Sequence, residues 1–101
     1  MTTMVTVTAG EVGFISCDGT PEEGQISFQP IAETKGEGSV VTVRKVTMAV
    51  AGGQIVPPNT LIGGITYVVN EYWSGIEPEP YNIVVDSTNV DMSAVERVAV
   101  G

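Results

Sequence analysis

The chain has 101 residues, with four lysine and arginine residues against twelve aspartate and glutamate residues, and a formal net charge of −8. A chain of this length buries one modest core, so we expect a single domain over residues 1–101 and no deep, enclosed active site. Its negative field repels phosphate backbones and anionic lipids, which argues against nucleic acid and membrane surfaces as partners.

The first third of the chain is rich in strand-forming residues. In residues 4–8, Val5 and Val7 alternate with threonine, and an alanine–glycine pair then predicts a bulge before strand character resumes at residues 12–16. Turn-forming residues at 17–24 come before a second strand, in which Ile26 and Phe28 share one face. The charged, glycine-bearing segment 33–39 predicts an exposed loop.

The middle of the chain predicts a strand that changes phase. Residues 40–51 are rich in valine, but the inward positions shift by one residue across Arg44 and Lys45, as a bulge or a change of sheet requires. A pair of glycines at 52–53 predicts a tight turn into residues 54–56, where two prolines then end the strand.

Residues 65–73 form the clearest predicted strand. Strict alternation divides them into two faces, and either face fits the core: Tyr67, Val69, Glu71 and Trp73 on one side, and Thr66, Val68, Asn70 and Tyr72 on the other. An acidic, proline-bearing loop at 74–80 then leads into a strand at 81–85.

The C-terminal segment contains two stretches, residues 90–96 and residues 97–100, and each fits two different structures. Ser93 and Glu96 have the spacing of a helix capping box, but a plain turn over residues 90–96 fits equally well. Residues 97–100 fit either a last strand of the same sheet or a strand that pairs with another chain.

Seven short motifs together span nearly the whole chain: Val5-Thr6-Val7-Thr8, Asp18-Gly19-Thr20-Pro21, Gly24-Gln25-Ile26-Ser27-Phe28-Gln29-Pro30, Gly64-Ile65-Thr66-Tyr67-Val68-Val69-Asn70-Glu71, Gly75, Tyr81-Asn82-Ile83-Val84-Val85 and Val90-Asp91-Met92. In this order they resemble the small β-sandwich modules of tailed actinobacteriophages. Such modules occur in minor tail proteins and related virion proteins of the transthyretin-like or carboxypeptidase-regulatory-like type.

The strand pattern and this resemblance imply one fold and one functional class. We expect an all-β, antiparallel β-sandwich of about seven short strands, with a transthyretin-like or immunoglobulin-like arrangement. The resemblance implies a structural protein of a phage virion, assembled in the bacterial host cytoplasm, whose partners are the major capsid protein or tail proteins. Because the chain stops at Gly101 without a fibre or coiled-coil segment, we expect a capsid decoration protein that docks on the assembled shell and stabilises it.

Three alternatives stay open. The chain also fits a minor tail protein or a tail-associated adhesion module that binds a carbohydrate or protein on the host surface. It fits a stand-alone sandwich from a cellular protein as well. A homo-oligomer is compatible with each of them.

The residue types argue against catalysis. Without histidine there is no Ser-His or Cys-His pair and no imidazole metal ligand. Cys17 lies beside Asp18, whose negative charge disfavours a thiolate. The acidic pairs lack the tightly spaced pattern of a calcium loop. We therefore expect no enzyme, no catalytic residue, no metal site and no cofactor.

The candidate interface comprises six residues: Tyr67, Tyr72, Trp73, Tyr81, Arg44 and Lys45. The four aromatic residues suit either core packing or a binding patch. Since neighbouring positions of a strand face opposite ways, at least one of Tyr72 and Trp73 must point away from the core. The two cations suit either a solvated strand surface or an anchor for an acidic neighbour.

Overall fold

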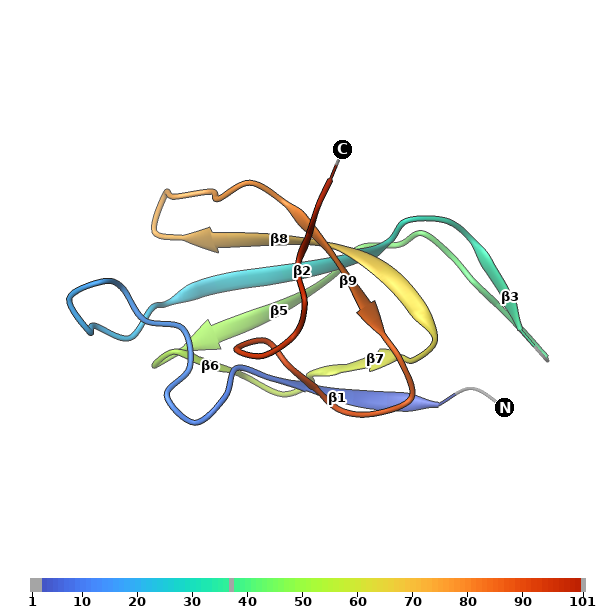
Figure 1. The fold of residues 1–101 in the computed structure, drawn as a ribbon, viewed down its shortest axis with the longest axis horizontal. Helices are drawn as coiled ribbons and strands as arrows, with labels where there is room; N and C mark the ends of the chain where they lie inside the picture. The colour runs from blue at the N-terminus through green and yellow to red at the C-terminus, as the bar shows by residue number, and fades with distance from the viewer. Residues whose placement is uncertain (1–2, 37, 101) are drawn as a thin grey trace.

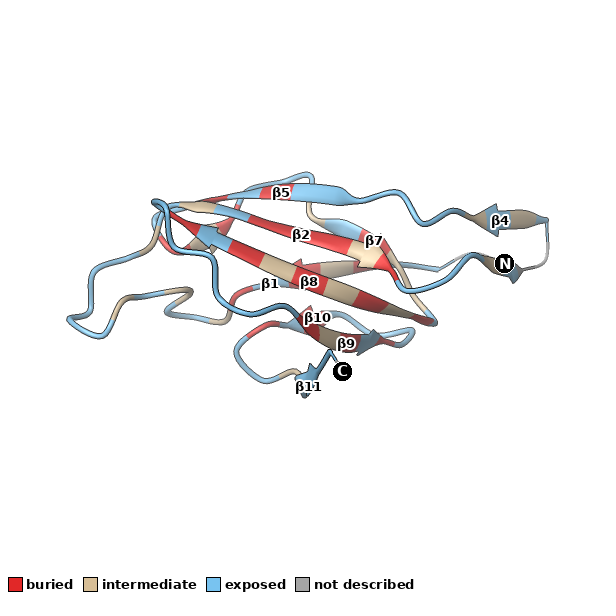
Figure 2. Ribbon diagram, turned by 90° about the horizontal axis from the view of Figure 1, so that it is seen from above, coloured by how far each residue is buried: buried red, intermediate tan, exposed pale blue. Residues whose placement is uncertain are grey.

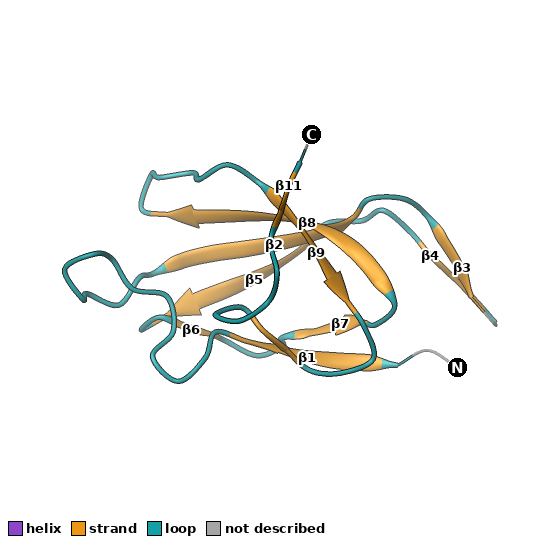
Figure 3. Cartoon of the chain, in the orientation of Figure 1, coloured by secondary structure: helices purple, strands orange, loops and turns teal. Residues whose placement is uncertain are grey.

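The computed structural model describes residues 3–36 and 38–100, and no helix occurs among them (Figure 3). None of this part of the chain therefore forms a helix that could cross a lipid bilayer. The strands are β1 (Met4–Thr8), β2 (Gly24–Pro30), β3 (Thr34–Gly36), β4 (Ser39–Val41), β5 (Val46–Ala51), β6 (Gln54–Ile55), β7 (Thr60–Ile62), β8 (Ile65–Trp73), β9 (Tyr81–Val85), β10 (Val90–Asp91) and β11 (Val98–Ala99).

Two sheets enclose the core, so the expectation of an all-β sandwich is confirmed (Figure 1). The larger sheet has the order β11-β9-β8-β2-β5-β6, and all its pairings are antiparallel. The smaller sheet has the order β10-β1-β7, in which β10 runs parallel to β1. Strands β3 and β4 form a separate hairpin that projects from one end of the body.

The core lies between the sheets and follows the alternation of the sequence (Figure 2). Val5 and Val7 of β1 in the smaller sheet and Ile26 and Phe28 of β2 in the larger sheet belong to this core, and all four are almost completely buried. Phe28 meets Tyr67 edge to face, with the ring centroids 6.4 Å apart. The Tyr67 hydroxyl donates a hydrogen bond to the carbonyl oxygen of Ile62, 2.8 Å away, which satisfies the polar end of a buried ring.

The structure decides which face of β8 is buried. Its burial alternates along the whole strand, and the inward residues are Ile65, Tyr67, Val69, Glu71 and Trp73. The other face, which includes Asn70 and Tyr72, lies on the outside of the larger sheet. The aromatic-rich face is thus the inner one, and it carries Glu71 into the core with it.

Two local predictions were wrong, one for a strand and one for a loop. Residues 12–16 form no strand and run as turns and loop, apart from an isolated bridge between Ile15 and Pro21. The segment predicted as the loop 33–39 begins the β3–β4 hairpin, because Thr34 pairs with Val41 and Lys35 with Val40. Glu37 lies outside the described residues.

The phase shift at Arg44 and Lys45 marks a change of sheet, one of the two explanations expected. β4 pairs with β3 in the hairpin, whereas β5 pairs with β2 in the larger sheet. Residues 42–45 connect the two without forming a strand.

The C-terminal segment closes on its own chain. Asp91 organises a turn rather than a helix, since its carboxylate accepts hydrogen bonds from the backbone and hydroxyl of Ser93, and its carbonyl accepts from Ala94 and Val95. β11 then pairs antiparallel with β9 at the edge of the larger sheet.

Candidate functional site

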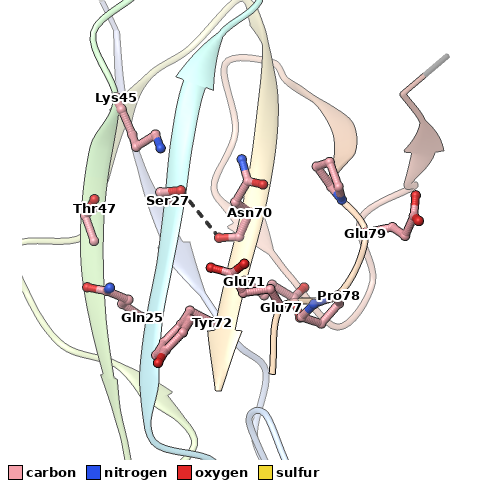
Figure 4. Close-up of a pocket in the computed structure, with 11 residues that line it drawn as sticks. Gln25, Ser27, Lys45, Thr47, Asn70, Glu71, Tyr72, Glu77, Pro78 and Glu79 are labelled. Carbon is pink, nitrogen blue, oxygen red and sulfur yellow. Dashed lines mark hydrogen bonds between the residues drawn. The ribbon is translucent and has the colours of Figure 1, made fainter. Parts of the chain in front are cut away.

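A groove lies on the outer face of the larger sheet, on the side opposite the core (Figure 4). We call it the outer groove; it encloses about 550 Å³ and is lined by Gln25, Ser27, Lys45, Thr47, Asn70, Glu71, Tyr72 and residues 77–80. Its floor comes from the three adjacent strands β5, β2 and β8. Ser27 pairs with Thr47 on one side and with Asn70 on the other, so these polar residues form one row.

The acidic segment after β8 forms one wall of the groove. Ser74 and Gly75 both have positive φ, and backbone hydrogen bonds of 2.8 and 2.9 Å between Trp73 and Ile76 close a tight hairpin turn. Glu77, Pro78, Glu79 and Pro80 then run beside the floor. Since each proline ring fixes its φ angle, this wall is stiffer than an ordinary loop.

The side-chain amides in the groove differ from most others in the protein in their hydrogen bonding. Four of the seven amides bond to backbone groups: Gln29 to Val43, Gln54 to Gly10 and Glu11, Asn59 to Val7, and Asn89 to Thr6. Within the described part of the chain, the Gln25 and Asn70 side chains have no hydrogen-bond partner, and the Asn82 Oδ1 atom is buried without one. All three of these residues lie on the outer face of the larger sheet.

Glu71, one of the residues that line the groove, has a buried carboxylate. Glu71 is 8% exposed, and its Oε1 atom accepts a hydrogen bond from the Trp73 indole nitrogen, 3.1 Å away. Its Oε2 atom accepts a hydrogen bond from the Tyr81 hydroxyl and lies 3.3 Å from an Arg97 guanidinium nitrogen. We call these four residues the Glu71 cluster.

Arg97 ties the C-terminal segment to this cluster. Its guanidinium carbon lies 4.4 Å from the centroid of the Tyr81 ring, in a cation–π contact. A guanidinium nitrogen of Arg97 also donates a hydrogen bond to the carbonyl oxygen of Met92. Burial raises the pKa of the Tyr81 hydroxyl, and its hydrogen bond to Glu71 raises it further. Tyr81 therefore stays protonated and acts as a hydrogen-bond donor. The Glu71 carboxylate therefore has partners from β8, β9 and the C-terminal segment, and removing one of them would leave a buried charge with fewer partners.

The six predicted interface residues lie in three different environments. Trp73, Tyr67 and Tyr81 are buried in the core, where each packs or hydrogen-bonds as described above. Tyr72 is exposed and lines the outer groove. Arg44 and Lys45 are both exposed but belong to different surfaces. Lys45 lines the outer groove, whereas Arg44 lines a separate hollow.

That second hollow belongs to a surface at the base of the β3–β4 hairpin, which we call the hairpin end. It consists of Arg44 and five apolar residues that are 42–56% exposed: Met4, Ile31, Val40, Val43 and Val46. Met4, Val40, Arg44 and Val46 line a hollow of about 370 Å³, and Ile31 and Val43 line the adjoining one. Pro30 lines both hollows and so connects them.

Residues 3–36 and 38–100 contain no group of three or more histidine, cysteine, aspartate or glutamate side chains that could hold a metal ion. Cys17 is exposed in the loop before β2. Asp18 in the same loop accepts hydrogen bonds from the Ser16 hydroxyl and the Thr20 backbone, which lower its pKa to about 2. Its carboxylate thus organises a turn.

No known protein family matches the chain, and no curated protein is significantly similar to it in sequence.

Sequence reasoning missed four residues that matter here. Gln25 and Asn70 look like ordinary solvent-facing strand residues, and only their lack of partners in the structure singles them out. Glu71 had a detectable signal, because it shares its strand face with Tyr67, Val69 and Trp73. Arg97 had none, since its contact with Glu71 joins residues far apart in the chain.

Proposed function

We propose that this protein is a non-enzymatic structural subunit of a phage virion that docks on the assembled shell through its hairpin end. The observation that carries the proposal is the concentration of exposed apolar side chains beside Arg44 at the base of the hairpin. Contiguous exposed apolar surface on a small protein is typical of an interaction site. The motifs that resemble virion modules supply the class of partner.

The charge distribution favours an acidic partner surface. Lys35 lies in the hairpin and Arg44 at its base, while Lys45, which follows Arg44, lines the outer groove. The fourth cation, Arg97, is paired with Glu71. Residues 33–45 carry three cations against Glu33 and Glu37, so a chain with a net charge of −8 is least acidic in this segment and meets an acidic shell most favourably there.

Docking would stabilise a shell by linkage. A subunit that binds only the assembled lattice lowers the free energy of that lattice by mass action, and many copies multiply the small gain of each. This mechanism needs shape and complementary contacts, and no reactive group.

Cosedimentation with shells assembled without this protein tests the proposal. We expect the purified chain to pellet with the shells, and the variant Val40→Ser/Val43→Ser to bind them at least about tenfold more weakly. Val12→Ser is the matched control, because Val12 is exposed but lies outside the hairpin end. Equal binding by all three proteins would contradict docking through this surface, and no pelleting of the wild type would contradict the function itself.

A further inference from the structure

The outer groove shares no lining residue with the two hollows of the hairpin end. A partner that fills these two hollows therefore covers none of the residues that line the groove. We propose that the outer groove binds a neutral oligosaccharide. This inference goes beyond shell docking, and each can fail without the other.

Tyr72 supplies a stacking surface. It is the one tyrosine of the described residues with an exposed side chain, and Figure 4 shows it reaching from β8 across β2, beside Gln25. Gln25 and Tyr72 are direct cross-strand partners, which holds the ring at a defined height above the sheet. The C–H face of a sugar ring is apolar and packs on an aromatic face, while its hydroxyl groups point outward to polar neighbours.

The unpaired amides supply donors and acceptors for those hydroxyl groups. Each amide presents both an acceptor oxygen and a donor nitrogen, which together match two adjacent hydroxyls of a sugar. Gln25 lies in the row of Tyr72, and Asn70 and Thr47 lie in the next row of the same face, about 7 Å along the strands. The side-chain amide of Gln29, by contrast, already uses its nitrogen to donate a hydrogen bond to the backbone carbonyl of Val43. Gln25 and Asn70 keep their full hydrogen-bonding capacity for a ligand.

The charges of the groove select a neutral ligand. Glu77 and Glu79 line one wall, and Lys45 is the single cation in the lining. Carboxylates accept hydrogen bonds from hydroxyl groups but repel sulfate, phosphate and carboxylate groups. Apolar peptides are disfavoured because hydroxyl, amide and carboxylate groups make up most of the lining. A volume of about 550 Å³ lies within the usual range of small-molecule sites.

A glycan array that carries neutral, sialylated and sulfated oligosaccharides is the first test, with the whole chain as the probe. We expect binding to a subset of the neutral glycans. With the best of these, Tyr72→Ala and Gln25→Ala/Asn70→Ala should each lose about tenfold or more in affinity, whereas Tyr72→Phe keeps the stacking ring and loses less. Val84→Ala is the control, since Val84 is exposed on the same face outside the groove.

Two further readouts make the result decisive. In a titration followed by NMR, the glycan should shift the side-chain amide signals of Gln25 and Asn70, and thermal unfolding should verify that each variant is folded. Binding that Tyr72→Ala leaves unchanged, binding to sulfated or sialylated glycans alone, or no binding to any neutral glycan would each overturn the proposal. Tyr72→Ala should still pellet with shells, which separates a failure here from a failure of docking.

Discussion

Tyr72 and Trp73 are neighbours in β8 but lie on opposite faces of the larger sheet, with Tyr72 38% exposed and Trp73 6% exposed. The Trp73 ring packs on Phe14 with centroids 4.9 Å apart, and its indole nitrogen donates to Glu71. One strand thus presents one aromatic ring to the core and the next to the outer groove.

This division predicts unequal losses of stability for two matched substitutions. Trp73→Ala should lower the free energy of unfolding by about 3–5 kcal/mol, because it opens a cavity and leaves the buried Oε1 atom of Glu71 without its donor. Tyr72→Ala should cost less than about 1 kcal/mol, as is usual for a surface position. Urea unfolding followed by circular dichroism measures both. A larger loss for Tyr72→Ala would mean that the faces of β8 are reversed.

The Glu71 cluster predicts that Arg97 matters for stability despite its place near the C-terminus. Arg97→Met should cost about 1–2 kcal/mol, less than the loss of a fully buried partner, because the guanidinium is partly exposed. Arg97→Lys should recover only part of this, since lysine lacks the planar group that stacks on Tyr81. The matched control is Arg44→Met, whose side chain has no ion pair within residues 3–36 and 38–100. Equal unfolding free energies for Arg97→Met and wild type would refute the role of the cluster.

Much of the fold followed from local patterns in the sequence. The spacing of Ile26 and Phe28 correctly predicted that they share one strand face, which is the buried one, and the Gly52-Gly53 turn is present with positive φ at both residues. These features depend on neighbours in sequence, which a pattern reveals directly.

Contacts between distant residues explain what the sequence did not predict. The parallel pairing of Val7 with Val90 and the ion pair of Arg97 with Glu71 both join segments far apart in the chain. Both faces of β8 carry apolar residues, so the sequence of the strand alone did not determine which face is buried. Packing against the opposing sheet determines it. For the outer groove, the sequence indicated Tyr72 but could not reveal which polar residues of other strands lie beside it.

Strand β2 approaches the end of β8 so closely at Gly24 that no side chain fits. A Cβ atom at this position would overlap the carbonyl oxygen of Tyr72. Gly24→Ala should therefore destabilise the protein by about 1–3 kcal/mol and displace the Tyr72 backbone. Unfolding measurements and the backbone amide shift of Tyr72 check this. The control is Ala49→Gly, which removes a methyl group from an exposed position of β5. An unchanged Tyr72 signal in Gly24→Ala would contradict the close approach.

Three aspartates predict a loss of stability in acid. Hydrogen bonds from the Ser16 hydroxyl and the Thr20 backbone lower the pKa of Asp18 from the ordinary value of 3.8 to about 2. The pKa of Asp86 and that of Asp91 are lowered by hydrogen bonds from the hydroxyl and backbone of Thr88 and of Ser93, respectively. A lowered folded-state pKa stabilises the fold above the unfolded pKa, and this contribution disappears as pH falls from about 4 to about 2.

The test compares thermal unfolding at several pH values for the wild type and for Asp18→Asn/Asp86→Asn/Asp91→Asn. Asparagine keeps an acceptor oxygen for each turn but does not titrate in this range. We expect a smaller decrease in the melting temperature between pH 4 and pH 2 in the variant. The same decrease in both proteins would show that other carboxylates govern the acid response.

The hairpin itself should be dispensable for folding and necessary for docking. β3 and β4 pair only with each other among the described strands, so replacing residues 34–40 with a short glycine–serine linker should change the unfolding free energy by about 1 kcal/mol or less. The shortened protein should no longer pellet with shells. Unimpaired pelleting would place the docking surface elsewhere.

An electron cryo-microscopy map of particles that carry this protein tests docking most directly. We expect density for the sandwich on the outside of the shell, with the β3–β4 hairpin and Arg44 against the shell and Tyr72 in solvent. Density for the sandwich away from the shell surface, or a map in which the outer groove contacts the shell and the hairpin points into solvent, would contradict docking through the hairpin end.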